Sequence, residues 1–112
     1  MLKYVYFGSP LISQMVLENL VKIYGKPVLI VTGQDKKSGR GLYVSPNPVK
    51  NYGVLNNISI LTPEKLKDIE REIKSYNADV GILFAYGKII PEWLLSVFNN
   101  NSALQPLDPL VS

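Results

Sequence analysis

Four short apolar runs, each separated from the next by a segment with helical features, constrain the fold of this chain most. They have strand length and are mostly aromatic or β-branched, and they lie at Lys3–Phe7, Pro27–Thr32, Ile58–Leu61 and Asp79–Ala85. Pro27–Thr32 is apolar almost throughout, as expected of a parallel strand covered on both faces. The alternation predicts an α/β class, with a Rossmann-like open parallel sheet of four strands and flanking helices. Right-handed crossovers favour the strand order 3-2-1-4.

Proline with a polar neighbour marks where most of the helices are expected to begin. The predicted starts are Ser9–Pro10, with Ser9 as the cap, then Asn47–Pro48, Thr62–Pro63 and Pro91. The third of these helices has one apolar stripe, formed by Leu66, Ile69, Ile73 and Tyr76. Its opposite face is charged, which is typical of a surface that only meets water.

Length and composition narrow the class of protein. The chain has 112 residues, which is enough for one domain with a real core. It has no cysteine and no histidine, so we expect no disulfide, no metal site and no histidine general base. No apolar run approaches the roughly 18 residues that span a bilayer. We therefore expect a cytoplasmic protein without a membrane partner, although an organelle stays open.

The positive charge is concentrated on one segment. The chain has 12 Lys and Arg against 9 Asp and Glu, and Gln34–Lys50 alone carries the net +3. Its cations are Lys36, Lys37, Arg40 and Lys50, and its one acid is Asp35. Gly39 and Gly41 allow the backbone to project Arg40, whose planar fork suits phosphate. Such a loop is compatible with binding to an RNA backbone and also with a merely solvated surface.

Two further segments follow predicted strands at the edge where parallel sheets bind ligands. Phe7–Pro10 is a tight turn into a helix, which is either an anion site or simply good turn chemistry. Ala85–Pro91 is an apolar loop that is either a clamp for a flat heterocycle or a packed connection. The chain lacks the G-x-G-x-x-G pattern of dinucleotide-binding proteins.

Together these segments resemble the N-terminal part of the methionyl-tRNA formyltransferase family. Phe7–Pro10 matches its FG-[ST]-P turn, and residues 31–50 match V-T-x-x-D-x-x-x-G-R-G followed by [ST]-P-x-P-V-K in register. Residues 63–66 match its P-E-x-L element, and Ala85–Pro91 matches A-Y-G-x-I-[IL]-P. The resemblance covers roughly residues 2–98, which we take as a partial formyltransferase domain (1–98) followed by an irregular tail (99–112).

The resemblance implies roles for particular residues. The segment around Arg40 would contact the acceptor stem of initiator methionyl-tRNA, together with Lys36, Lys37, Gly39 and Gly41. Ser9 would lie near the aminoacyl end of that tRNA. The pocket for the formyl donor, 10-formyltetrahydrofolate, would be bordered by Gly87, Lys88, Ile89 and Ile90.

The chain also departs from the family pattern. The family continues with Glu-Phe-Ala after the turn, whereas this chain has Leu11–Ser13. The catalytic Asn-x-His motif, the Ser-Leu-Leu-Pro loop and a later aspartate are expected after Ser102, where the sequence reads ALQPLDPLVS. We therefore assign no catalytic residue and expect an incomplete fold that is inactive alone. Whether residues 99–112 are native sequence stays open.

The predicted incompleteness has a structural consequence. A fourth strand without a neighbour would expose a bare hydrogen-bonding edge, open to a companion chain or to self-association.

Two other functions stay open besides that of a fragment of a methionyl-tRNA formyltransferase. The chain could be a non-catalytic RNA-binding module that uses Gly39–Gly41, or another 10-formyltetrahydrofolate-dependent formyltransferase, such as one acting on an amino sugar.

Overall fold

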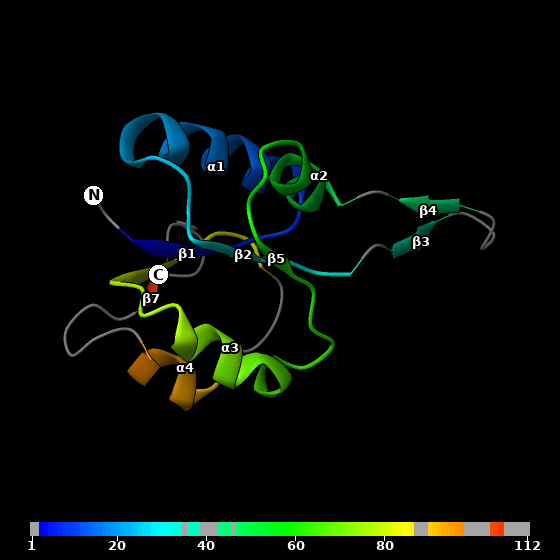
Figure 1. Ribbon diagram of the computed structural model, residues 1–112. Helices are drawn as coiled ribbons and strands as arrows, with labels where there is room; N and C mark the ends of the chain where they lie inside the picture. The colour runs from blue at the N-terminus through cyan, green and yellow to red at the C-terminus, as the bar shows by residue number, and fades with distance from the viewer. Residues whose placement is uncertain are drawn as a thin grey trace.

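The computed structural model describes residues 3–34, 36–38, 43–45, 47–86, 90–97 and 104–106. Within these ranges, a five-stranded parallel sheet lies between two layers of helices (Figure 1). Its strands in spatial order are β5 (Ile60–Leu61), β2 (Leu29–Val31), β1 (Tyr4–Phe7), β6 (Val80–Leu83) and β7 (Leu104–Pro106). A separate antiparallel pair is formed by β3 (Lys36–Ser38) and β4 (Tyr43–Ser45).

The helices cover the two faces of the sheet in the manner of an α/β fold. One face carries α1 (Leu11–Tyr24) and α2 (Pro48–Leu55) (Figure 1). The other face carries the 3₁₀ helix η1 (Leu66–Ile69), α3 (Glu70–Ser75) and α4 (Glu92–Val97). Because both faces are covered, the strands can be apolar along their whole length.

The predicted strand order 3-2-1-4 is confirmed. The first, second, third and fourth predicted strands are β1, β2, β5 and β6, and they pair in the order β5-β2-β1-β6. The observed strands are shorter than the apolar runs that predicted them. β5, for example, keeps only the last two residues of Ile58–Leu61.

The central strand β1 supplies the core of both layers. All four of its residues are 0% exposed. Val5 and Phe7 pack with residues of η1, α3 and α4, whereas Tyr4 and Tyr6 pack with residues of α1 and α2. Alternate side chains of a strand point to opposite faces, so this one strand joins two hydrophobic clusters.

The start of α1 differs from the prediction. Pro10 is the N-cap residue, in extended conformation, and its carbonyl accepts hydrogen bonds from the amides of Ser13 and Gln14. Ser9 makes no cap because its hydroxyl accepts a hydrogen bond from the amide of Gly33 at 2.9 Å. The local sequence assigns the Ser9 side chain to the cap of α1, but it bonds instead to a residue that is distant in the sequence.

Two other predictions need correction. The third helix begins at Leu66 as η1 rather than at Thr62–Pro63, although its stripe is confirmed, with Leu66, Ile69 and Ile73 buried. The tail is not irregular throughout, because β7 pairs with β6 from Gly81 to Leu83. The edge of β6 is therefore not bare at these residues. The short β7 ends in proline. Proline has no N–H to donate to a ladder, and edge strands tolerate it because one side of such a strand has no partner.

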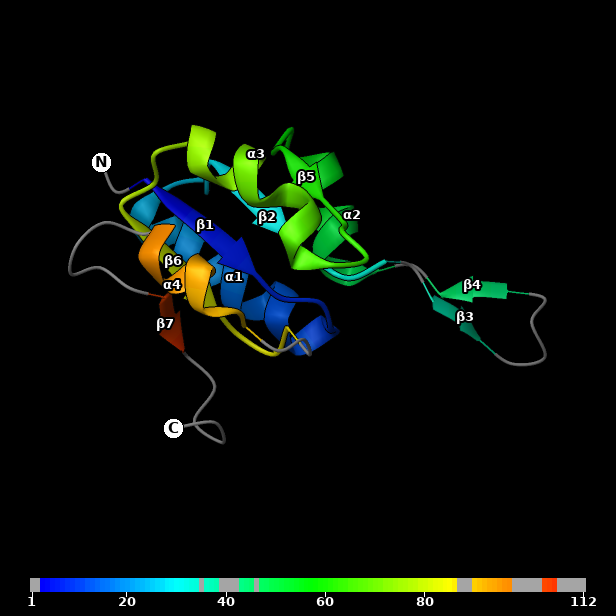
Figure 2. The same ribbon diagram turned by 90° about the horizontal axis from the view of Figure 1, so that it is seen from below.

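The basic segment contains a hairpin where the sequence predicts only a loop. Lys36 pairs with Ser45, Lys37 with Val44 and Ser38 with Tyr43. Figure 2 shows β3 and β4 standing apart from the five-stranded sheet, beyond α2 and β5. Tyr43 and Val44 have high β-propensity, and glycines between the strands favour a turn.

Candidate functional site

The carboxyl ends of three strands bring the predicted site segments to one edge of the sheet. Phe7 is in register with Val31 of β2 and with Leu83 of β6. Beyond the strands, the amide of Gly8 donates to the carbonyl of Val31 at 3.2 Å, and that of Phe84 donates to Phe7 at 2.9 Å. β2 lies on one side of β1 and β6 lies on the other, so the strand order reverses at this point. Open α/β sheets bind ligands at such a switch point.

Gly8 is required where β1 and β6 end. A Cβ at this position would collide with the hydroxyl of Ser13 and would lie 2.7 Å from the carbonyl oxygen of Phe84. No residue with a side chain fits that space without movement of the α1 start or of the β6 end. Gly8 therefore permits the close approach on which the shape of the edge depends.

Ser13 explains one departure from the family pattern. Its side chain is 0% exposed, and its hydroxyl donates to the carbonyl of Phe84 at 2.9 Å. The hydroxyl of Tyr6 donates to the carbonyl of Ser13 at 2.8 Å and lies 2.7 Å from its Oγ. Burial raises the pKa of Tyr6 to about 12, so it stays a neutral donor. At the position where an alanine is expected, the hydroxyls of Tyr6 and Ser13 thus each donate to a backbone carbonyl.

Ser9 lies on the β2 side of this edge. It is half-buried, and besides the amide of Gly33 it meets the hydroxyl of Thr32 at 3.4 Å. Asn47 reaches the same place from the start of α2 and contacts both Thr32 and Gly33. These contacts were not foreseen from the sequence, which indicated Asn47 only as a helix cap. A position for Ser9 near an aminoacyl end stays a prediction.

The segment after β6 has two unusual features. Ala85 has a φ of 53°, in the left-handed region that costs a residue with a Cβ roughly 1–2 kcal/mol. Tyr86 is 5% exposed, and its hydroxyl has no hydrogen-bond partner within the described residues. Its ring meets that of Phe7 edge to face, with centroids 5.8 Å apart. The sequence did not signal either feature, because both depend on how the β6 end packs on β1.

The predicted donor-pocket residues fall mostly beyond the described part of the chain. Gly87, Lys88 and Ile89 lie outside it, so their role stays a prediction. Ile90 is half-buried and packs against the cluster that contains Phe7 and Tyr86. The two ends of this loop are thus anchored on the core beside the edge.

The predicted RNA-binding residues are only partly described. Lys36 and Lys37 lie in β3, apart from the sheet. Gly39, Arg40 and Gly41 stand between β3 and β4 in the sequence and are outside the described residues. Their predicted roles are therefore not tested by the structure.

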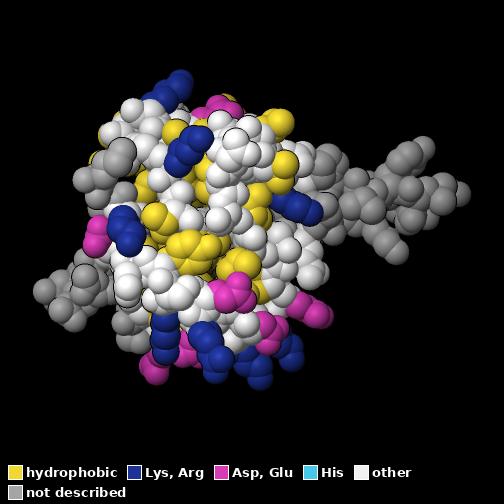
Figure 3. All heavy atoms as spheres, in the orientation of Figure 1, with side chains coloured by type: hydrophobic (Ala, Val, Ile, Leu, Met, Phe, Trp, Pro, Cys, Tyr) yellow, Lys and Arg dark blue, Asp and Glu magenta, His cyan; other side chains and the backbone are white. Residues whose placement is uncertain are grey.

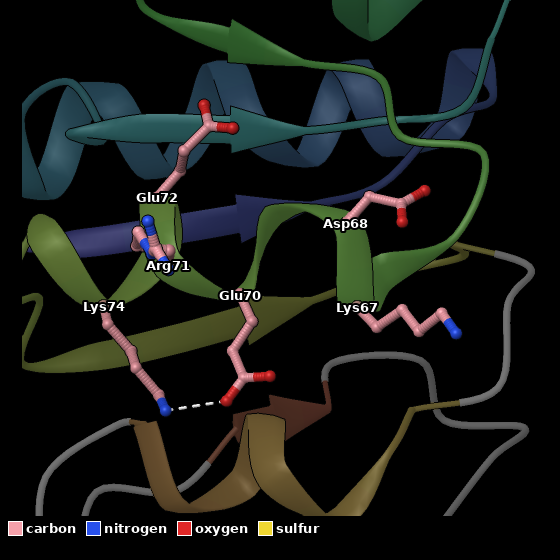
Figure 4. A pocket seen from close by; sticks show the side chains of 6 residues that line it. All are labelled: Lys67, Asp68, Glu70, Arg71, Glu72 and Lys74. Atoms are coloured by element: carbon pink, nitrogen blue, oxygen red, sulfur yellow. Dashed lines mark hydrogen bonds and ion pairs between the residues drawn. The ribbon is translucent and has the colours of Figure 1, made fainter.

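A hollow elsewhere on the surface does not belong to this edge. It is lined by η1 and α3 side chains of both charges, Lys67, Asp68, Glu70, Arg71, Glu72 and Lys74 (Figure 4). Charged side chains gather over the part of the surface where these helices lie (Figure 3). The ion pair between Lys74 and Glu70, at 2.7 Å, is exposed and lies one helical turn apart. This is the solvated helix face that the sequence predicts.

The described residues contain neither a metal-binding cluster nor a membrane-spanning helix. No three His, Cys, Asp or Glu side chains among them are grouped so that they could hold a metal ion. None of the helices described is long and apolar enough to cross a membrane.

The covered parallel sheet, with its turns gathered beyond the ends of β1, β2 and β6, defines an α/β protein of the Rossmann-like class. Residues 2–103 match the sequence profile of the family described as formyl transferase. Because this match covers most of the chain, the protein belongs to the formyl transferase family.

Similar proteins agree with this assignment. The chain is 38% identical over 96 residues to a methionyl-tRNA formyltransferase of Elusimicrobium minutum, covering 86% of this chain and 28% of that protein. It is 42% identical over 101 residues to one of Dictyoglomus thermophilum, covering 86% and 31%. These relatives confirm the predicted resemblance. The chain spans less than a third of the length of either one.

A solved structure supports the fold. Glycinamide ribonucleotide transformylase 1 from Geobacillus kaustophilus superposes with a TM-score of 0.63 at 17% identity. The superposition covers 93% of this chain and 56% of that one. At this identity the likeness concerns the fold, which is the formyltransferase form of the open sheet that the sequence predicts.

Gly8→Ala tests the close approach of β1 and β6. We expect it to lower the free energy of unfolding by about 1–3 kcal/mol, because the new methyl group overpacks a site bounded by backbone. Urea unfolding followed by circular dichroism measures the change. Gly33→Ala is the matched control, since among the described residues its Cβ would meet only the Ser9 side chain, at 3.1 Å. Equal costs for the two variants would contradict this account of Gly8.

Tyr86→Phe tests the unpartnered hydroxyl. At neutral pH we expect the variant to be as stable as the parent or more stable, by up to about 1 kcal/mol, because it removes a buried polar group. A loss above about 1 kcal/mol would show that the hydroxyl has a partner.

The same variant has a second readout at alkaline pH. Burial raises the pKa of Tyr86 from 10 to about 12, so the unfolded chain releases this proton first. Deprotonation of Tyr86 therefore leaves stability unchanged below pH 10 and lowers it as the pH rises from 10 towards 12. We expect Tyr86→Phe to lose less stability over this range, by on the order of 1–3 kcal/mol. Identical pH profiles would contradict the raised pKa.

Proposed function

We propose that this chain is the N-terminal part of a methionyl-tRNA formyltransferase, which formylates the amino group of methionyl-initiator tRNA. In this proposal the carboxyl edge of the sheet is where the formyl donor and the aminoacyl end of the tRNA meet. The relatives with 38% and 42% identity are named methionyl-tRNA formyltransferase, which supports the proposal. The chain contributes binding groups, and the proposal gives it no catalytic residue.

The donor is proposed to be 10-formyltetrahydrofolate, held beyond the end of β6. Support comes from the family match and from the packing at this place. Ala85 in its left-handed conformation turns the chain out of β6, and Tyr86 and Ile90 hold both ends of the loop on the core. Gly87–Ile89 would thereby present backbone groups to a flat pterin ring.

The tRNA is proposed to bind the hairpin that leaves the sheet after β2. The observation that carries this part is the concentration of charge, since Gln34–Lys50 alone accounts for the net +3 of the chain. Lys36 and Lys37 lie in β3, and Arg40 follows them in the sequence. Cations gathered on an element that stands apart from the sheet can follow a phosphate backbone.

Arg40→Ala tests the tRNA part. We expect the Kd of the chain for initiator tRNA at low salt to rise roughly tenfold or more, because a charge-assisted hydrogen bond to phosphate is lost. The slope of log Kd against log salt concentration should fall by about one. Fluorescence anisotropy of labelled tRNA measures both quantities.

Arg71→Ala is the matched control for this experiment. Arg71 lies on the exposed face of α3, and its removal changes the net charge of the chain by the same amount. We expect it to leave the affinity within about twofold of the parent. Equal weakening by both variants would mean that only net charge matters, and absence of binding at low salt would overturn the tRNA part.

A further inference from the structure

The two arms of the β3–β4 hairpin meet beyond the carboxyl end of β2. The outgoing arm leaves β2 through Thr32 and Gly33, and the returning arm enters α2 at Asn47. Among the described residues, the ladder of the hairpin joins β3 to β4 and to no strand of the five-stranded sheet. We define the place where the two arms meet the body of the protein, Thr32, Gly33 and Asn47, as the root of the hairpin.

Asn47 joins the two arms at this root. Its Nδ2 donates to the hydroxyl of Thr32 and to the carbonyl of Gly33, both at 2.7 Å. Its Oδ1 accepts from the amides of Val49 and Lys50, at 3.0 and 3.2 Å. All four hydrogen-bonding positions of the amide are thus used. The orientation of the amide is fixed, because the carbonyl of Gly33 can only accept.

The root is also tied to the turn after β1 and to β5. The amide of Gly33 donates to the hydroxyl of Ser9, and the amide of Thr32 donates to the carbonyl of Leu61 in β5. Thr32 is 0% exposed and Asn47 is 7% exposed. Hydrogen bonds in such a buried place are costly to leave unmade, so they hold the root in one arrangement.

Capping of α2 does not account for these contacts. A cap needs an oxygen that accepts from the first turn, which serine, threonine or aspartate would also supply. The two bonds from Nδ2 contribute nothing to that cap, and they reach the opposite arm of the hairpin. A carboxylate here would keep the cap, and the Thr32 hydroxyl could turn to donate to it, but the bond to the Gly33 carbonyl would be replaced by repulsion between two acceptors.

We propose that Asn47 is a positioning residue that fixes the direction of the β3–β4 hairpin relative to the sheet. With respect to RNA, this inference rests on the proposed function, because a fixed hairpin would present its cations to tRNA without a loss of conformational freedom on binding. The part that concerns the hairpin itself can be tested without any RNA.

Asn47→Asp separates the two roles of the side chain. The chain has no cysteine, so Ser38→Cys in β3 and Lys67→Cys in η1 allow two spin labels to be placed without other changes. Electron–electron double resonance then gives the distribution of distances between hairpin and body. We expect one narrow peak for the labelled parent and a broadened or shifted distribution for Asn47→Asp.

Asn56→Asp is the matched control. Asn56 ends α2, and its Nδ2 donates to the carbonyl of Tyr52 at 2.8 Å, away from the hairpin root. We expect the distance distribution of this variant to match that of the parent. If circular dichroism shows that Asn47→Asp does not fold, Asn47→Ser, which also keeps a cap oxygen, is measured in its place. A distribution equal to that of the parent in a folded Asn47 variant would overturn the proposal.

Affinity for initiator tRNA separates this inference from the proposed function. We expect Asn47→Asp to raise Kd several-fold, and to do so less in the Arg40→Ala background, because both changes act through the hairpin. A broadened distribution with unchanged affinity would keep the positioning role and overturn its part in RNA binding. A broadened distribution in a chain that binds no tRNA at all would overturn the proposed function alone.

Discussion

The parallel pairing of β1 with its two neighbours is the constraint on which the rest of this structure depends. Tyr4–Phe7 is fully buried, and its alternate side chains form parts of both hydrophobic clusters. At its carboxyl end the missing Cβ of Gly8 lets the start of α1 and the end of β6 approach. The turn that follows β1 and the segment that follows β6 are thereby brought to one place, where this fold binds its ligands.

Polar side chains then fix how the neighbouring segments leave that edge. Ser13 links the start of α1 to the β6 end, while Ser9 and Asn47 link β1, β2 and α2. Each of these hydroxyl or amide groups is half-buried or buried and is satisfied by backbone of another element. These hydrogen bonds define the geometry of the edge at which the hairpin and the segment after β6 begin.

Much of the fold could be predicted because local pattern and tertiary structure agree. The apolar runs, the strand order and the capping oxygen of Asn47 all follow from periodicity, crossover handedness and helix-start chemistry. The second role of Asn47 and the true partner of Ser9 could not be predicted, because their partners are distant in sequence. The pairing of β7 was missed for a related reason, since Leu104–Pro106 has no periodicity and pairs only because β6 offers a free edge.

The central claim is that ligands of this formyl transferase family member bind beyond the ends of β1 and β6. Titration of the ¹⁵N-labelled chain with 10-formyltetrahydrofolate, followed by amide chemical shifts, tests it most directly. The account predicts shifts at Gly8, Ser9, Ala85 and Tyr86, with little change on the charged face of η1 and α3. Shifts confined to that charged face, or none at a saturating donor concentration, would contradict it.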